Sequence, residues 1–122
     1  MKLLITGTRK PKGFRNEYHS IVDNALTNRC FANPDEELEL IEGCCSDSAD
    51  EFAEIWAKEQ DVKVNHRPAN NGKYLKRNIE MVDECEEVLA FWDGWSYGTA
   101  HTIATALMRD KKVKIIELKK VV

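Results

Sequence analysis

The sequence predicts an α/β domain in which a mostly parallel sheet of about five strands carries helices on both faces. Short apolar segments of strand length alternate along the 122 residues with longer segments whose apolar residues recur at helical spacing. No Asn-Gly turn joins two strand-like segments directly, and strands connected through a helix lie parallel. The length suits one domain with a buried core, so residues 1–122 are predicted to form a single domain.

The strands are predicted from short apolar runs bounded by turn-forming residues. They fall at residues 3–6, 38–41, 62–66, 88–92 and 112–118. The segment 88–92 is an uninterrupted apolar run, which is typical of a strand buried on both faces of a parallel sheet. Pro34 precedes the second strand and Pro68 follows the third, and proline interrupts regular structure at both places.

The helices are predicted from apolar residues that fall on one face. The first has apolar positions Tyr18, Ile21, Val22, Ala25 and Leu26, and the second has Ala49, Phe52, Ala53, Trp56 and Ala57. The third carries Leu75, Ile79 and Val82, and the fourth is expected to bury Ala100, Ile103, Ala104 and Leu107. Asp47 is the expected N-cap of the second helix, with Asp50 in its first turn, and Thr99 is the expected cap of the fourth.

Composition restricts the class of protein. Hydrophobic residues make up 43% of the chain and charged residues 32%, and no apolar run approaches membrane-spanning length. The first apolar segment is too short for a secretory signal, so a cytoplasmic location and no membrane partner are expected. A net charge of −3 argues against a nucleic-acid partner. Two small basic clusters are either solvated surface charges or a local anion site: Arg9, Lys10, Lys12 and Arg15, and Lys73, Lys76 and Arg77.

The cysteines argue against a metal site. Cys44 and Cys45 are adjacent, and neither Cys30 nor Cys85 completes a Cys-x-x-Cys spacing. This pattern disfavours a disulfide framework and a zinc site. Reduced thiols, no metal and no cofactor are therefore expected.

Turns rich in glycine and hydroxyl side chains follow three of the predicted strands. Ligands of open parallel sheets bind at the carboxyl ends of the strands, where backbone N–H groups and hydroxyls suit phosphate or ribose oxygens. The alternative is that these residues only form turns and caps. The candidate ligand-binding residues of the three turns are Gly7, Thr8 and Arg9; Gly43, Cys44, Ser46 and Asp47; and Asp93, Gly94, Tyr97, Gly98 and Thr99.

Arg77 and Asn78 extend the candidate set from the start of the third helix. A cation near a helix N-terminus opposes the helix dipole, so a ligand or a carboxylate is expected to compensate it. Arg77 is preferred to Lys76 because the planar guanidinium pairs well with phosphate. Trp95 and Tyr97 could stack on a base, pack as a lid or contact another subunit. His101 is either an acid/base group or an ordinary helix residue.

These motifs, in this order, resemble the SLOG superfamily, and more narrowly the small bacterial and phage proteins of the YspA-like type (DUF2493). The resemblance is carried by Gly7-x-Arg9, Glu42-Gly43-Cys44-Cys45-Ser46-Asp47-Ser48-Ala49-Asp50, Arg77-Asn78-x-x-Met81 and Asp93-Gly94 with Gly98-Thr99-Ala100. It implies a Rossmann-like three-layer domain that binds a nucleotide or nucleotide-derived small molecule, as a sensor or sequestering module. A homo-oligomer is compatible with it.

The same superfamily includes the cytokinin-activating, lysine-decarboxylase-like phosphoribohydrolases, and the resemblance to them makes Arg77 a candidate catalytic residue. Nucleoside deoxyribosyltransferases are similar in the Asp-Gly and Gly-Thr-Ala motifs. Both families carry a glutamate soon after Gly-Thr, whereas this chain has Ala100, His101 and Thr102. N-glycosidic cleavage needs a carboxylate near its cationic centre, with Asp93 or Asp47 as the possible substitutes. The sequence therefore favours binding, with a non-standard glycosidic enzyme as the alternative and a nucleic-acid-associated module as a third.

Overall fold

The computed structural model describes residues 1–9 and 14–118, and within them it confirms the α/β fold. The strands are β1 (Lys2–Gly7), β2 (Glu39–Glu42), β3 (Lys63–His66), β4 (Glu87–Trp92) and β5 (Lys112–Glu117). The helices are α1 (Arg15–Ala32), α2 (Ala49–Glu59), α3 (Tyr74–Glu84) and α4 (Tyr97–Met108). All strand pairs are parallel, in the order β3-β2-β1-β4-β5. No described helix is long and apolar enough to cross a membrane.

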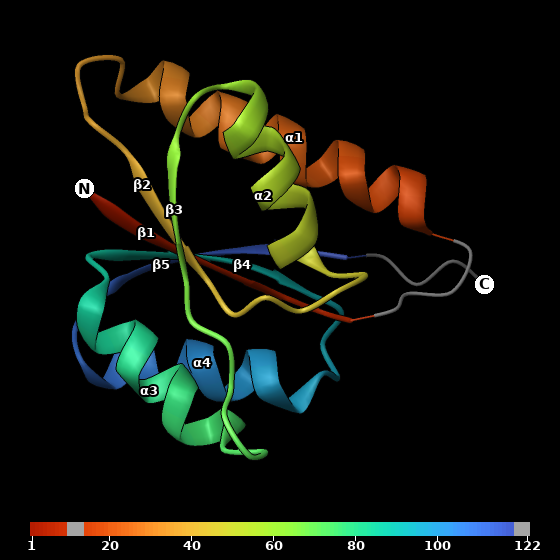
Figure 1. Ribbon diagram of the computed structural model, residues 1–122, viewed down its shortest axis with the longest axis vertical. Coiled ribbons are helices and arrows are strands. Elements are labelled where there is room, and N and C mark those ends of the chain that lie inside the picture. Colours follow the sequence, from red (N-terminus) through yellow and green to blue (C-terminus); the bar gives the residue numbers. More distant parts are fainter. Residues whose placement is uncertain (10–13, 119–122) are drawn as a thin grey trace.

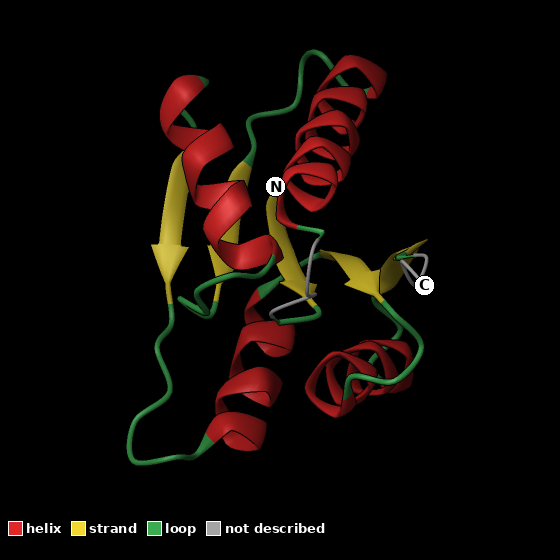
Figure 2. Cartoon of the chain, turned by 90° about the vertical axis from the view of Figure 1, so that its right-hand side faces the viewer, coloured by secondary structure: helices red, strands yellow, loops and turns green. Residues whose placement is uncertain are grey.

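The sheet forms the middle layer of three. Helices α1 and α2 pack on one face, and α3 and α4 pack on the other (Figure 1). Because side chains alternate along a strand, Leu3 and Ile5 of β1 join the core under α1 and α2, whereas Leu4 joins the core over α3 and α4. Figure 2 shows the same two helix pairs on opposite sides of the strands. Each apolar core is therefore closed by one pair of helices.

The strand order reverses between β1 and β4. From β1 the chain continues to β2 and β3 on one side, and it returns to β4 and β5 on the other. The helix that follows β1 and the helix that follows β4 consequently lie on opposite faces of the sheet (Figure 1). Their connecting loops diverge, and this leaves a crevice at the carboxyl ends of β1 and β4.

The buried face of α4 differs from the prediction. Ala104 and Leu107 are exposed and Ala100 is only half-buried, whereas Thr102 and Ala106 are buried beside Ile103. This helix is apolar nearly all round, so spacing alone did not select a face. Thr102 can be buried because its hydroxyl donates to the carbonyl oxygen of Gly98 at 3.1 Å.

The face of α3 also differs. Leu75 is exposed and Ile79 is half-buried, and the buried residues are Arg77, Asn78, Met81 and Val82. Arg77 and Asn78 can occupy the inward face because Arg77 donates to the carbonyls of Gly43 and Arg67 outside the helix and to Asn78 Oδ1 beside it. Of the apolar positions expected for α3, Val82 alone is fully enclosed.

Two predicted caps are also wrong. Ser48 is the N-cap of α2, and its Oγ accepts from the N–H of Asp50 at 3.1 Å. Asp47 instead has a φ of 51° and pairs with Arg15 at 2.6 Å. Helix α4 begins at Tyr97 with Ser96 as its N-cap, so Thr99 lies inside the first turn. In both helices a serine one to three residues before or after the predicted cap takes that position, within the usual error of a boundary predicted from sequence.

Candidate functional site

A pocket of about 400 Å³ lies at the carboxyl ends of the strands, in the crevice where the strand order reverses. Its walls come from the end of β1, the β2–α2 turn, the first turns of α3, and the β4–α4 turn. The residues that carry polar groups or backbone into it are Thr6, Gly7, Arg9, Cys45, Asp50, Tyr74, Arg77, Asn78, Ser96, Gly98 and Thr99. Four segments that are distant in sequence therefore meet in one cavity.

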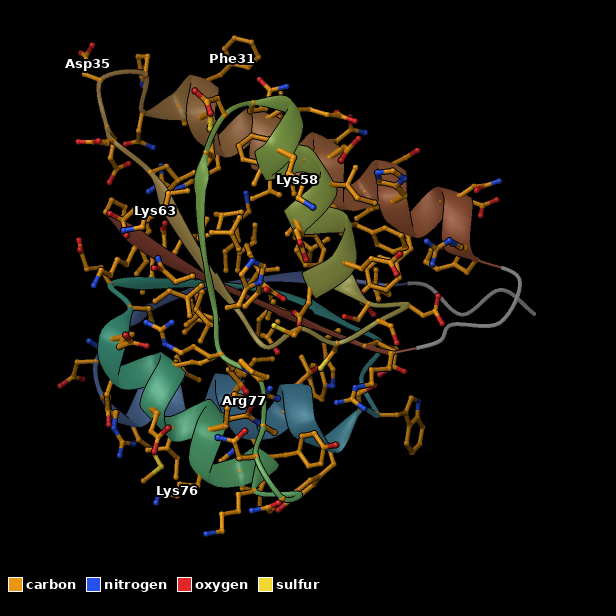
Figure 3. All side chains as sticks on the ribbon, viewed as in Figure 1. Phe31, Asp35, Lys58, Lys63, Lys76 and Arg77 are labelled. Carbon is orange, nitrogen blue, oxygen red and sulfur yellow. The ribbon has the colours of Figure 1, made fainter. Side chains whose placement is uncertain are left out.

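Arg77 is the most enclosed cation of the pocket, with 9% of the residue exposed. Its Nη1 donates to the carbonyl oxygens of Gly43 at 2.8 Å and Arg67 at 3.1 Å, and its Nε donates to Asn78 Oδ1 at 3.1 Å. None of these bonds uses Nη2, which has no hydrogen-bond partner among the described residues. Figure 3 shows Arg77 directed toward the strand ends, while Lys76 points away. One edge of the guanidinium is thus fixed and the other is available to a ligand.

Gly43 is required for this placement of Arg77. A Cβ at position 43 would lie 2.5 Å from Arg77 Nη1 and 2.7 Å from Cζ. Any side chain there would push the guanidinium out of its place. The Gly43 candidate therefore supports the pocket from behind and does not line it.

Tyr74 links two cations at the pocket. The guanidinium carbon of Arg9 lies 5.4 Å from the centre of the Tyr74 ring, and that of Arg77 lies 5.7 Å from it. Both distances are in the range of cation–π attraction. Arg9 also donates from Nη2 to Cys45 Sγ at 3.0 Å. Tyr74 was not among the candidates, although its position three residues before Arg77 places both on one helix face.

Asp50 supplies a buried carboxylate to the pocket. Its Oδ2 accepts from the N–H groups of Gly43 and Cys45, both at 3.2 Å. Burial, and then the charge of Glu42, raises the pKa of Asp50 to about 6. We expected this residue only as a partner of the helix dipole. A usable signal was present, because Asp50 has the helical spacing of the buried Ala53 and Ala57.

The β4–α4 turn is held by Asp93 and Thr8. Asp93 Oδ1 accepts from the N–H groups of Trp95 at 2.8 Å and Ser96 at 2.9 Å. Burial opposes ionisation, but these hydrogen bonds prevail and lower the pKa of Asp93. Thr8 Oγ1 accepts from the N–H of Asp93 and lies 3.1 Å from Ser96 Oγ. Ser96 makes no side-chain cap to α4, so no serine hydroxyl competes with a ligand for the first-turn N–H groups.

The pocket includes some of the predicted residues and leaves others outside. Gly7, Arg9, Arg77, Asn78, Gly98 and Thr99 line it. Thr8 and Asp93 stabilise the turn, and Gly94 allows that turn a φ of 86°. Cys44 and Ser46 line a smaller neighbouring pocket, and Asp47 pairs with Arg15. Tyr97 is 72% exposed and stacks on His101. Lys10 and Lys12 lie outside the described residues.

The resemblance to nucleoside deoxyribosyltransferases would place their glutamate at Thr102. Its side chain is buried and bonded to the Gly98 carbonyl, so it offers no charge to the pocket. Neither of the substitutes considered from the sequence lines the pocket, since Asp47 pairs with Arg15 and Asp93 holds its own turn. Asp50 is the carboxylate that does.

The raised pKa of Asp50 predicts a specific pH dependence of stability. Because folding raises this pKa from 3.8 to about 6, the folded protein holds the proton more tightly than the unfolded chain. The resulting stabilisation is complete below about pH 4 and is lost as the pH rises through about 6. We expect the unfolding free energy of the wild type, minus that of Asp50→Asn, to fall by on the order of 3 kcal/mol across this window.

Urea denaturation of both proteins at closely spaced pH values measures this difference. A matched control is Asp83→Asn, whose exposed carboxylate pairs with Arg109 at the far end of α3. If the difference in unfolding free energy stays constant or rises between pH 4 and 7, burial does not disfavour the ionised form of Asp50.

Comparison with known proteins adds a structural likeness only. No protein-family model matches the chain, and no curated protein matches its sequence. Among solved structures, the chain is similar to the X-ray structure of TM1055, a target of the Northeast Structural Genomics Consortium. The TM-score is 0.74, and the match covers 92% of this chain and 71% of that one at 16% identity. This likeness shows a shared Rossmann-like α/β fold.

Proposed function

We propose that the pocket binds a nucleotide or a nucleotide-derived small molecule, and that the protein acts as a sensor or sequestering module for it. The observation that carries the proposal is the half-satisfied guanidinium of Arg77, buried in the crevice at the strand-order reversal. Burying a cation is costly unless its hydrogen-bonding capacity is used. An anionic group of the ligand at Nη2 completes that capacity.

The phosphate site is formed by Arg77, Arg9 and the start of α4. Gly98 and Thr99 belong to the first turn of α4 and line the pocket. The first N–H groups of a helix and the positive end of its dipole favour an anion. The first turn of α3 also has neither a side-chain cap nor an acidic residue. Two helix starts and two guanidinium groups thus supply positive potential to one cavity.

The remaining polar groups suit a ribose. The ionised carboxylate of Asp50 only accepts hydrogen bonds, and a pKa of about 6 leaves it largely ionised at neutral pH. A carboxylate in the wall that faces a phosphate site can accept from sugar hydroxyls. The pocket volume of about 400 Å³ lies within the range of small-ligand sites.

Thermal denaturation with a ligand series tests this function. We expect saturating nucleoside monophosphates to raise the melting temperature by about 5 °C or more, and the matching nucleosides and inorganic phosphate to raise it less. Calorimetric titration of the best ligand gives its affinity. No shift with any mono-, di- or cyclic nucleotide at millimolar concentration would refute the proposal.

A second candidate function is cleavage of an N-glycosidic bond, and it is favoured by the Asp50 carboxylate in the pocket. In that reaction the water hydroxyl adds to the ribose anomeric carbon and the base leaves with a proton. A nearby carboxylate stabilises the cationic transition state. Chromatography of incubated nucleoside 5′-monophosphates detects free base. Release of free base by the wild type, and its loss in Asp50→Asn, would support this candidate. Nucleotide binding without any release of base would support the binding function only.

A further inference from the structure

A cluster of metal-binding side chains lies beside the pocket, at the carboxyl ends of β2 and β3. One possible ligand atom from each of Glu42, Cys44 and His66 lies within 4.8 Å of the other two. We propose that these three residues bind a divalent transition metal of the zinc class, with water or Glu54 as the fourth ligand. The expectation of no metal rested on cysteine spacing, which does not detect ligands that two adjacent strands bring together.

Strand register produces the cluster. Glu42 and His66 end adjacent parallel strands and are direct register partners. The imidazole Nδ1 of His66 is hydrogen-bonded to Oε1 of Glu42. Cys44 then follows β2 by two residues and folds back over the same carboxylate. An oxygen, a nitrogen and a sulfur atom consequently lie close together. Zinc binds all three types of ligand atom.

The spacing of the sulfur and carboxylate already suits tetrahedral coordination. Cys44 Sγ lies 3.5 Å from Glu42 Oε1. In a tetrahedral zinc site, with Zn–S about 2.3 Å and Zn–O about 2.0 Å, sulfur and oxygen ligands lie about 3.5 Å apart. The metal would replace the proton between Glu42 and His66, and binding would release the thiol proton of Cys44.

The Glu42 carboxylate lacks a permanent cationic partner. Its side chain is 1% exposed, and no lysine or arginine of the described residues pairs with it. Its contacts are the His66 ring, the Cys44 N–H at 2.6 Å and the Cys44 thiol. Buried carboxylates are normally paired with a cation or bound to a metal. A dication at this point supplies the missing charge.

The surroundings provide access and a further ligand. Glu51 and Glu54 of α2 line a pocket of about 200 Å³ together with Glu42 and Cys44. Cys44 and His66 are exposed, so an ion can enter from solvent. Cys44 also has a φ of 61°, a left-handed conformation that glycine adopts with less strain than any residue with a side chain. The turn thus keeps a cysteine where the backbone alone would favour glycine, and this conformation holds the thiol over Glu42.

Cobalt titration of the untagged, chelator-treated protein tests the site. We expect one equivalent of Co²⁺ to produce a thiolate-to-cobalt charge-transfer band in the near ultraviolet, and Zn²⁺ to displace it. Cys44→Ser should abolish the band, and His66→Gln should weaken Co²⁺ binding by at least about tenfold. Both side chains are exposed, so both variants should fold, which circular dichroism checks.

Cys45→Ser is the matched control, because the adjacent cysteine lines both pockets but is not one of the three clustered residues, and its Sγ accepts from Arg9. It should retain the band and the stoichiometry. The inference is overturned if no band appears, if the band survives Cys44→Ser, or if Cys45→Ser removes it instead. Cys44 does not line the ligand pocket, so Cys44→Ser should leave nucleotide binding unchanged, and failure of the metal site and failure of the nucleotide site are separate results.

Discussion

Arg77→Ala is expected to weaken nucleotide binding by about a hundredfold or more. The substitution removes a buried guanidinium whose Nη2 edge is available to the ligand, while the ligand phosphate still enters the same enclosed crevice. Hydrogen bonds to charged groups contribute about 1.5–3 kcal/mol each, and an unpaired buried charge adds to the loss. Calorimetric titration of wild type and variant with one nucleoside monophosphate measures the change.

Two companion variants separate binding from folding. Lys76→Ala removes an exposed cation from the neighbouring position of α3 and should leave the affinity unchanged. Arg77→Lys keeps the charge but replaces the planar guanidinium, which can bond to Gly43 and Arg67 on one edge and a phosphate on the other, with a single ammonium nitrogen. We therefore expect an intermediate loss of affinity. Urea denaturation of each variant, in the buffer and at the temperature of the titration, checks that the variant is folded under those conditions. An unchanged affinity in folded Arg77→Ala would remove Arg77 from the site.

Gly7→Ala is expected to lower the free energy of unfolding by about 3 kcal/mol. A Cβ at this position would lie 2.3 Å from the Tyr18 hydroxyl, 2.8 Å from Ala49 Cβ and 3.1 Å from the Phe91 carbonyl oxygen. Tyr18 is fully buried, so its ring has no space into which to move. Its hydroxyl also donates to the Thr8 carbonyl at 3.0 Å and accepts from the Ala49 N–H at 3.1 Å. Displacing the hydroxyl breaks both bonds.

A double-mutant cycle tests the cause of this destabilisation. Tyr18→Phe alone leaves two buried backbone groups unpaired and should cost about 1–3 kcal/mol. In the Gly7→Ala background it also removes the atom closest to the new Cβ, so the double variant should be more stable than the sum of the single losses predicts. Strict additivity would contradict the proposed clash.

Gly98→Ala is the control for adding a methyl group to a glycine. A Cβ on Gly98 would meet no atom within 4 Å, and the residue lies in α4. Alanine is a better helix former than glycine, so this variant should keep or gain stability by up to about 1 kcal/mol. Destabilisation equal to that of Gly7→Ala would show that any methyl group at this edge of the sheet is harmful.

The fold was predictable because its signals are local. Alternation of strand-like and helix-like segments indicated parallel strands, and the structure has five of them in the order β3-β2-β1-β4-β5. The residues after β1 and β4 were predicted to meet, since the ends of parallel strands share one edge of a sheet. Gly7, Arg9, Gly98 and Thr99 do line one pocket there. Arg77 was singled out because a cation early in a helix needs a partner, and it too lies in the pocket.

Errors arose where several local patterns were equally satisfied. Helix α4 has apolar residues on nearly every side, so its buried face depended on how it packs against the sheet. Asp47 and Ser48 are both good N-caps, and the backbone of the turn selected Ser48. Cys44 and Cys45 are adjacent residues of the same type, so the sequence does not distinguish their roles. The turn nevertheless directs Cys45 to the ligand pocket and Cys44 over Glu42.

Hydrophobic periodicity and turn chemistry act between near neighbours, so local patterns in the chain specify the succession of strands and helices and the edge of the sheet that carries the polar turns. Which side chains face one another across that edge depends on the packing of the folded protein. Tyr74 reaches Arg9, Asp50 enters the pocket, and His66 lies beside Glu42 because strand register and helix packing bring together residues far apart in the chain. Such contacts depend on the position of whole elements, and no local pattern encodes that position.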